Sequence, residues 1–138
     1  MIKLMIVDDH SYVRQALSEM FSETEDIRVV GECADGTEVV NTALHTEPDV
    51  VLMDDSMPMM TGLEATRRLL SARPASRVVM HTGTATLDRV CEALTLGAVG
   101  YLTKGENARA LPACVRAVAA DLAVWSPSAA AHLPHCDN

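Results

Sequence analysis

The chain has 138 residues, of which 49% are hydrophobic, so it can form one domain with its own core and is not of the disordered class. Its net charge of −8 argues against nucleic-acid binding by this chain itself, because a duplex requires a cationic face. No apolar stretch approaches the ~20 residues of a membrane span, and no signal sequence is evident. We therefore expect a cytoplasmic protein with no membrane partner.

The first half of the chain alternates apolar runs with apolar residues at helical spacing. The runs predict strands over Ile2–Val7, Ile27–Cys33 and Val50–Met53. Between them, the spacing predicts one helix from Ser11 to Glu23 and another that opens at Gly36. The third run is apolar without alternation, as expected for a strand that is covered on both faces.

The second half continues the same alternation. A capping-box pattern, Thr61-Gly62-Leu63-Glu64, predicts that a third helix starts near Gly62. Pro112 lacks a backbone donor and belongs in the first turn of the last helix. The remaining expected elements are a strand over Arg77–His81, a helix from Leu87 that ends at Gly97, a strand over Val99–Leu102 and a helix carrying Leu111 to Leu122.

This order predicts an α/β fold in which residues 1–125 form one doubly wound parallel sheet of five strands with five helices. Residues 126–138 contain Ala and Pro with little patterning, and they are interpreted as a linker or C-terminal tail.

Polar side chains follow four of the predicted strands. Asp8 and Asp9 follow the first, Asp54 the third, Thr82 the fourth and Lys104 the fifth. The carboxyl ends of parallel strands face one common crevice, so these groups can converge there. Three carboxylates, a hydroxyl and an ammonium suit a divalent cation and a phosphoryl group.

The chain resembles the receiver domain of two-component response regulators over roughly residues 2 to 125. The motifs that carry the resemblance are Val7-Asp8-Asp9-His10, Val51-Leu52-Met53-Asp54 with Met57-Pro58 and Gly62, Thr82, and Gly100-Tyr101-Leu102 with Lys104. Within that family the chain is most similar to the NarL/FixJ (LuxR-type) transcription factors. The resemblance implies a flavodoxin-like fold with strand order 2-1-3-4-5.

The resemblance also implies a role for each polar residue at the strand ends. Asp54 would be the phosphoacceptor, with Lys104 and Thr82 contacting the phosphoryl group. Thr82 and Tyr101 would form a switch. Mg²⁺ would be the cofactor, with ligands from Asp9 and Asp54 directly, Asp8 through water, and the backbone carbonyl of Ser56.

Simpler interpretations exist for the same residues. Asp8 and Asp9 can be a helix N-cap and a solvated acid. Thr82 can be an ordinary β-branched strand residue, and Tyr101 can be a half-buried aromatic with a wet tip. Lys104 can be a solvated surface lysine.

For function, the family implies a phosphoacceptor switch that is not a turnover enzyme. Its partners would be a sensor histidine kinase, a second copy of the chain in a phosphorylation-dependent homodimer, and DNA only through a C-terminal module absent from this chain. One alternative is an interaction domain that works without phosphate. A Mg²⁺-dependent phosphohydrolase with an aspartyl nucleophile is less favoured, because Ser56 stands where such enzymes carry a second acid.

Several positions depart from the family pattern. Asp55 stands where a large apolar residue is usual, and strand alternation points it away from Asp54. Gly105 follows Lys104 where a cis proline is common, so a cis peptide is not expected. His81 is interpreted as a packed or hydrogen-bonded residue, and His10 as a loop residue beside the acidic pocket.

The cysteines and the C-terminal histidines carry weaker signals. The four cysteines form no CxxC pair, and for a cytosolic chain a disulfide is the less favoured interpretation; they are Cys33, Cys91, Cys114 and Cys136. His132, His135 and Cys136 offer only a weak signal for a transition metal.

Overall fold

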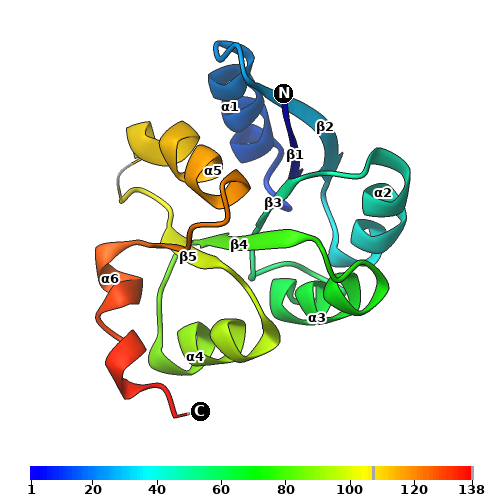
Figure 1. Cartoon of the computed structure of the whole chain (residues 1–138). Helices are drawn as coiled ribbons and strands as arrows, with labels where there is room; N and C mark the ends of the chain where they lie inside the picture. The colour runs from blue at the N-terminus through cyan, green and yellow to red at the C-terminus, as the bar shows by residue number, and fades with distance from the viewer. Residues whose placement is uncertain (107, 138) are drawn as a thin grey trace.

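Six parallel strands form one sheet in the computed structural model, which describes residues 1–106 and 108–137 (Figure 1). The strand order is β2-β1-β3-β4-β5-β6, so the predicted order is confirmed and extended by one strand. The strands are β1 (Ile2–Val7), β2 (Ile27–Cys33), β3 (Val50–Met53), β4 (Arg77–Thr82), β5 (Gly100–Thr103) and β6 (Val124–Trp125).

Helices cover both faces of this sheet, as the alternation of elements predicts (Figure 1). Buried side chains of α1 and α5 pack on one face, and those of α2, α3 and α4 pack on the other. The α-helices are α1 (Ser11–Ser22), α2 (Val39–Thr46), α3 (Gly62–Ala72), α4 (Leu87–Leu96), α5 (Leu111–Ala119) and α6 (Pro127–Ala130). Short 3-10 turns are η1 (Gly36–Glu38), η2 (Ala108–Ala110) and η3 (Leu133–His135). Within the described residues, no helix is both long and apolar enough to cross a bilayer.

Local sequence signals set the ends of α3, α4 and α5. The Thr61 hydroxyl accepts a hydrogen bond from the Glu64 backbone N–H at 3.2 Å, which is half of the predicted capping box. Gly97 ends α4 with φ 103°, a backbone conformation that favours glycine. Pro112 lies in the first turn of α5, where its missing N–H costs no helical hydrogen bond.

The predicted last helix is too long at its C-terminal end. α5 ends at Ala119, and Asp121 adopts a positive φ of 67°. The N–H of Leu122 bonds to the Ala117 carbonyl, and that of Asp121 to the Val118 carbonyl, which is the hydrogen-bond pattern of a Schellman motif. Leu122 is therefore exposed and does not belong to the apolar stripe of the helix.

The prediction gave five strands and five helices, whereas the described residues form six strands and six α-helices, and the added strand β6 is the main correction to the sheet. β6 pairs with β5 in parallel, with Gly100 opposite Val124 and Tyr101 opposite Trp125. A Cβ on Gly100 would lie 2.4 Å from the Val124 carbonyl oxygen, so the glycine allows β6 to approach. A glycine within a strand often marks a site where another backbone approaches closely.

Candidate functional site

The carboxyl ends of the central strands bring the predicted polar residues together. Backbone hydrogen bonds continue beyond the strands: Asp54 N–H donates to the Val7 carbonyl at 2.9 Å, and Lys104 N–H donates to that of Thr82 at 2.7 Å. Asp8, Asp54 and Thr82 are each at most 2% exposed. The residues on which the phosphoryl-site prediction depends thus share one edge of the sheet.

Three carboxylates crowd this edge. One ligand atom from each of Asp8, Asp9, His10 and Asp54 lies within 4.8 Å of the others. Asp8 Oδ2, Asp9 Oδ1 and Asp54 Oδ2 are buried and make no hydrogen bond with good geometry. Three carboxylates gathered in one largely buried cluster repel one another, so this cluster is suited to a cation that binds oxygen ligands.

Lys104 supplies positive charge to the same cluster. Its Nζ lies 2.7 Å from Asp8 Oδ2 and 3.5 Å from Asp54 Oδ2, so the closer ion pair is with Asp8. Burial lowers the pKa of Lys104, but its contacts with the two carboxylates outweigh that effect, and the net shift is upward. The Lys104 side chain is 24% exposed and its ammonium contacts the acidic pocket, so it is not simply a solvated surface lysine.

The carboxyl group of Asp54 has a raised pKa. Burial is the largest cause, and the negative charge of Asp8 is the second. Lys104 opposes both effects without cancelling them. The neighbouring negative charges disfavour the ionised form of Asp54, and its Oδ2 makes no hydrogen bond with good geometry. A carboxylate of this kind is a good candidate nucleophile.

Asp8 also orders the chain before α1. Its Oδ1 accepts a hydrogen bond from the His10 backbone N–H at 2.9 Å. The His10 ring lies at the rim of the pocket, with Nδ1 3.2 Å from Asp8 Oδ1 and 3.1 Å from Asp9 Oδ1. The helix N-cap interpretation of Asp8 is not supported, because His10 is the N-cap of α1 and no side chain caps that helix. Metal binding by Asp8 stays a prediction.

Asp55 points away from Asp54, as strand alternation predicts. Its Oδ1 accepts a hydrogen bond from the Leu63 N–H at 3.1 Å, and its Oδ2 lies 2.6 Å from Arg89 Nη1. The side chain of Asp55 is 4% exposed, so this is an ion pair with one buried partner. Asp55 thus connects the end of β3 with α3 and α4, and the Arg89 contact is one that sequence reasoning did not find.

Gly62 allows α3 to start beside the acceptor. A Cβ at this position would lie 1.9 Å from the Asp54 carbonyl oxygen and 2.8 Å from the Asp55 Cα. No other residue type fits that approach without displacing the backbone of Asp54. Ser56 is exposed in the loop between them, and its backbone ligation stays a prediction.

Tyr101 does not have the wet tip of the simpler interpretation. Its side chain is fully buried, and its hydroxyl donates to the Thr84 carbonyl at 2.8 Å, in the loop between β4 and α4. Burial, together with the negative charge of Asp55, raises the pKa of Tyr101 to about 12. His81, one residue before Thr82, is held neutral because burial lowers its pKa to about 4, with help from the Lys104 charge.

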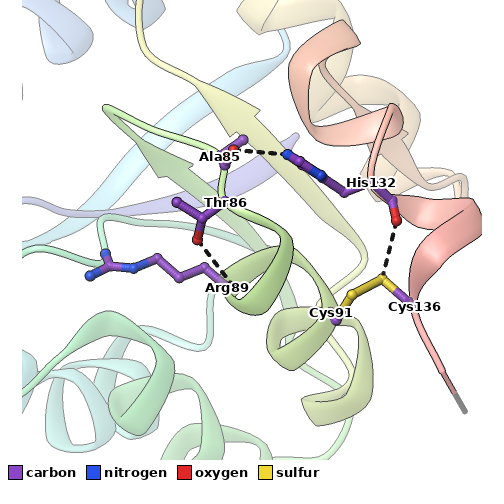
Figure 2. The surroundings of a disulfide bond; sticks show 6 residues. All are labelled: Ala85, Thr86, Arg89, Cys91, His132 and Cys136. Carbon is purple, nitrogen blue, oxygen red and sulfur yellow. Dashed lines mark hydrogen bonds between the residues drawn. A yellow bond between two sulfur atoms is a disulfide. The ribbon is translucent and has the colours of Figure 1, made fainter.

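The cysteines and the C-terminal histidines differ from expectation. Cys91 and Cys136 form a disulfide (Figure 2). Cys33 and Cys114 are free. The weak metal signal at His132, His135 and Cys136 is not supported. The Cys136 sulfur is bonded to Cys91, and those three residues form no metal-binding group among the described residues.

Comparison with known proteins identifies the family. Residues 4–116 match the response regulator receiver domain, so the chain belongs to that family. Its relatives indicate a NarL/FixJ-type receiver. The chain is 39% identical to the response regulator GacA of Pseudomonas aeruginosa over 140 residues, covering 96% of this chain and 62% of GacA.

Two further relatives agree with this class. The chain is 35% identical to the transcriptional regulatory protein LiaR of Bacillus subtilis, over 85% of this chain and 56% of LiaR. The crystal structure of a LuxR-family two-component response regulator from an Aurantimonas species matches with a TM-score of 0.90 at 31% identity, covering 96% of this chain and 95% of that one. The chain spans about 62% of the length of the GacA proteins that it matches.

Proposed function

We propose that this chain is the phosphoacceptor domain of a response regulator, and that a sensor histidine kinase donates a phosphoryl group to Asp54. The observation that carries the proposal is the buried Asp54 carboxylate, which has a free Oδ2 beside Lys104 and two further carboxylates. In the reaction, an Asp54 oxygen forms a bond to phosphorus as the phosphorus–nitrogen bond to the donor histidine breaks. The chain acts on itself and is not a turnover enzyme.

Lys104 and Thr82 would stabilise the product. The Lys104 ammonium already lies 3.5 Å from Asp54 Oδ2 and can neutralise charge on the phosphoryl oxygens. Thr82 ends the adjacent strand and offers a hydroxyl to the same group. In this role the Thr82 hydroxyl moves toward the phosphoryl group, and Tyr101 occupies the space beneath the β4–α4 loop.

The acidic cluster fits Mg²⁺. Asp9 and Asp54 would bind it directly, Asp8 through water, and the Ser56 carbonyl would complete the protein ligands; the close approach of the three carboxylates supports this fit. When bound, the cation neutralises the charge that the phosphoryl group brings into the pocket.

The output is a changed interaction surface. Because LiaR is a transcriptional regulatory protein, and the GacA and LiaR relatives are longer than this chain, we propose that the regulator acts on transcription in the cytoplasm. A C-terminal DNA-binding module would contact DNA, and phosphorylation would favour a homodimer. Two copies suit two DNA half-sites.

Phosphorylation with a small phosphodonor and Mg²⁺ tests the assignment. The wild type should gain one phosphate by intact mass, and Asp54→Asn should gain none. Asp55→Asn is the matched control, because it removes the neighbouring carboxylate on the other side of the strand, and it should still be phosphorylated. Labelling that survives Asp54→Asn but not Asp55→Asn would reverse the assignment.

Thr82→Ala tests the switch separately. This variant should accept phosphate but lose much of the phosphorylation-dependent dimer, because the hydroxyl that links the phosphoryl group to the β4–α4 loop is gone. Sedimentation of wild type and Thr82→Ala, each with and without a stable phosphoryl mimic, measures the difference. If the mimic leaves the wild-type mass unchanged at high concentration, this chain does not dimerise through phosphorylation.

A further inference from the structure

The C-terminal segment, residues 126–136, is attached to β5 as well as to α4 (Figure 1). The Ser126 N–H donates to the Tyr101 carbonyl at 3.0 Å, and the Ser126 hydroxyl lies 3.3 Å from the Thr103 N–H nitrogen. Ala129 is fully buried in the same core cluster as Tyr101 and the buried residues of α4. These contacts make the C-terminal segment a part of the fold next to the switch residue Tyr101.

A covalent bond joins the end of this segment to α4. Cys91 lies in the middle of α4, Cys136 follows η3, and their Cα atoms are 5.2 Å apart (Figure 2). Both residues are partly exposed, so a thiol reagent can reach them. The two free cysteines do not compete for the pairing, because Cys33 is buried and Cys114 lies on α5, which covers the opposite face of the sheet.

The C-terminal segment also makes a hydrogen bond to the loop that follows Thr82. His132 Nε2 lies 3.1 Å from the Ala85 carbonyl (Figure 2); a carbonyl only accepts, so the ring nitrogen must donate. The preceding carbonyl, that of Thr84, accepts from the Tyr101 hydroxyl. Two neighbouring carbonyls of the β4–α4 loop are therefore held by two different parts of the chain.

We propose that Cys91 and Cys136 form a redox-operated clamp on α4. With the disulfide formed, the C-terminal segment stays docked and the β4–α4 loop is held through His132. Reduction frees the segment, uncovers the face of α4 beneath it and releases that loop. In the disulfide form the Cys136 sulfur, 3.6 Å from the His132 carbonyl, carries no proton, so only the reduced thiol can donate a hydrogen bond there.

The chemistry is thiol–disulfide exchange with a small cellular thiol of the glutathione class. In the opening direction, two small-molecule thiols give two electrons and two protons to the Cys91–Cys136 bond. The products are one small-molecule disulfide and two protein thiols. The closing direction consumes the small disulfide and returns two small thiols. A disulfide in a reducing compartment, where we place this regulator, is more often redox-sensing than structural.

The signalling consequence rests on the function proposed above. Phosphorylation at Asp54 acts through Thr82 and the loop that His132 holds, so the clamp opposes movement of that loop without blocking access to Asp54. The oxidised protein should accept phosphate as the reduced one does but form the phosphorylation-dependent dimer less readily. The redox state of the disulfide would thus set how strongly phosphorylation promotes the dimer.

The experiment compares the wild type in oxidised and in reduced glutathione. Peptide mapping after alkylation under denaturing conditions should recover a Cys91–Cys136 cross-link only in the oxidised sample, with two alkylated cysteines against four in the reduced one. Hydrogen exchange of residues 83–86 and 126–136 should be slower in the oxidised form, on the order of tenfold, because local opening requires undocking. Cys136→Ser should exchange like the reduced wild type in both buffers, and Cys114→Ser should behave as wild type.

Two outcomes would overturn the clamp: alkylation of all four cysteines in oxidised glutathione, or identical exchange of both segments in the oxidised and reduced forms. Phosphate incorporation, measured on the same samples, separates this inference from the proposed function. If neither form is phosphorylated, the phosphoacceptor assignment fails, while the exchange data still decide whether the clamp exists.

Discussion

The acidic pocket and the C-terminal segment lie at the same end of the sheet, but they relate to stability in opposite ways. In the pocket, the carboxylates of Asp8 and Asp54 are buried close to one another, and Lys104 only partly offsets their repulsion. In the C-terminal segment, the polar groups of Ser126 and His132 have partners, Ala129 is buried, and a disulfide adds a covalent tie. Repulsion between carboxylates destabilises the pocket, and a ligand can relieve it. The contacts of the C-terminal segment instead stabilise the neighbouring loop.

Reduction of the disulfide should have the largest effect on stability. The bond closes a stretch with a sequence separation of 45 residues, and restricting the unfolded chain over such a loop stabilises a protein by about 4 kcal/mol. Urea unfolding of the wild type with and without a dithiol reductant measures the loss. In Cys136→Ser the reductant should have no effect, and an equal loss in that variant would show that the stabilisation comes from elsewhere.

Mg²⁺ should stabilise the pocket by less. A ligand present at one hundred times its dissociation constant raises the unfolding free energy by about 2.7 kcal/mol. Asp9→Ala should lose most of this gain and Asp8→Ala less, because Asp9 is expected to bind directly. Thermal unfolding with Mg²⁺ or with a chelator provides the measurement.

The matched control for the metal site is Glu25→Ala. It removes one negative charge at an exposed position before β2, outside the acidic pocket, and should retain the wild-type response. A Mg²⁺ response of equal size in the wild type and Asp9→Ala would contradict the site, because a nonspecific charge effect would then explain both.

Arg89→Met tests the ion pair between Asp55, which follows the acceptor Asp54, and α4, to which the C-terminal segment is tied. Removing the guanidinium leaves the Asp55 carboxylate buried without its charged partner, which should cost roughly 2 kcal/mol after allowing for the exposure of Arg89. Arg116→Met is a close control, because Arg116 is as exposed as Arg89 (45% and 44%) but its partner Asp26 is 49% exposed against 4% for Asp55. Denaturant unfolding should show little change for Arg116→Met, and similar losses in both variants would contradict a special role for Asp55.

The acidic pocket could be predicted from the sequence because parallel strand geometry determines where strand ends meet. The residue that follows a buried strand, such as Asp54 after β3, must lie at the common edge wherever the helices pack. The strands themselves were predictable because runs such as Val50–Met53 are buried on both faces.

The clamp could not be predicted in this way. β6 has two residues, too few for a periodicity signal, and it determines the path of everything after it. The approach of Cys136 to Cys91 depends on that path, and so does the His132 contact with Ala85. The pairing of Arg89 with Asp55 depends likewise on how α4 lies on the sheet. These contacts depend on tertiary packing, which the local sequence pattern does not indicate.

The smallest expected effect is a pH dependence that isolates the repulsion in the pocket. The pKa of Asp54 is raised above its ordinary value of 3.8, so the folded state binds this proton more tightly than the unfolded state does. Stability at this site should therefore increase as the pH falls through the raised pKa toward 3.8, the reverse of a carboxylate with a lowered pKa such as Glu64. Without metal, Asp54→Asn should be more stable than the wild type near neutral pH, by on the order of 1 kcal/mol.

That difference between the two proteins should shrink as the pH falls, because protonated Asp54 and asparagine are both neutral. Glu64 is present in both proteins, so its own titration cancels in the comparison. Denaturant unfolding of the wild type and Asp54→Asn across the acidic range, in the presence of a chelator, measures it. A stability difference that stays constant or grows on acidification would mean that the charges near Asp54 do not disfavour its ionised form. The contrast between a strained pocket and a stabilising C-terminal segment would then lose its electrostatic basis.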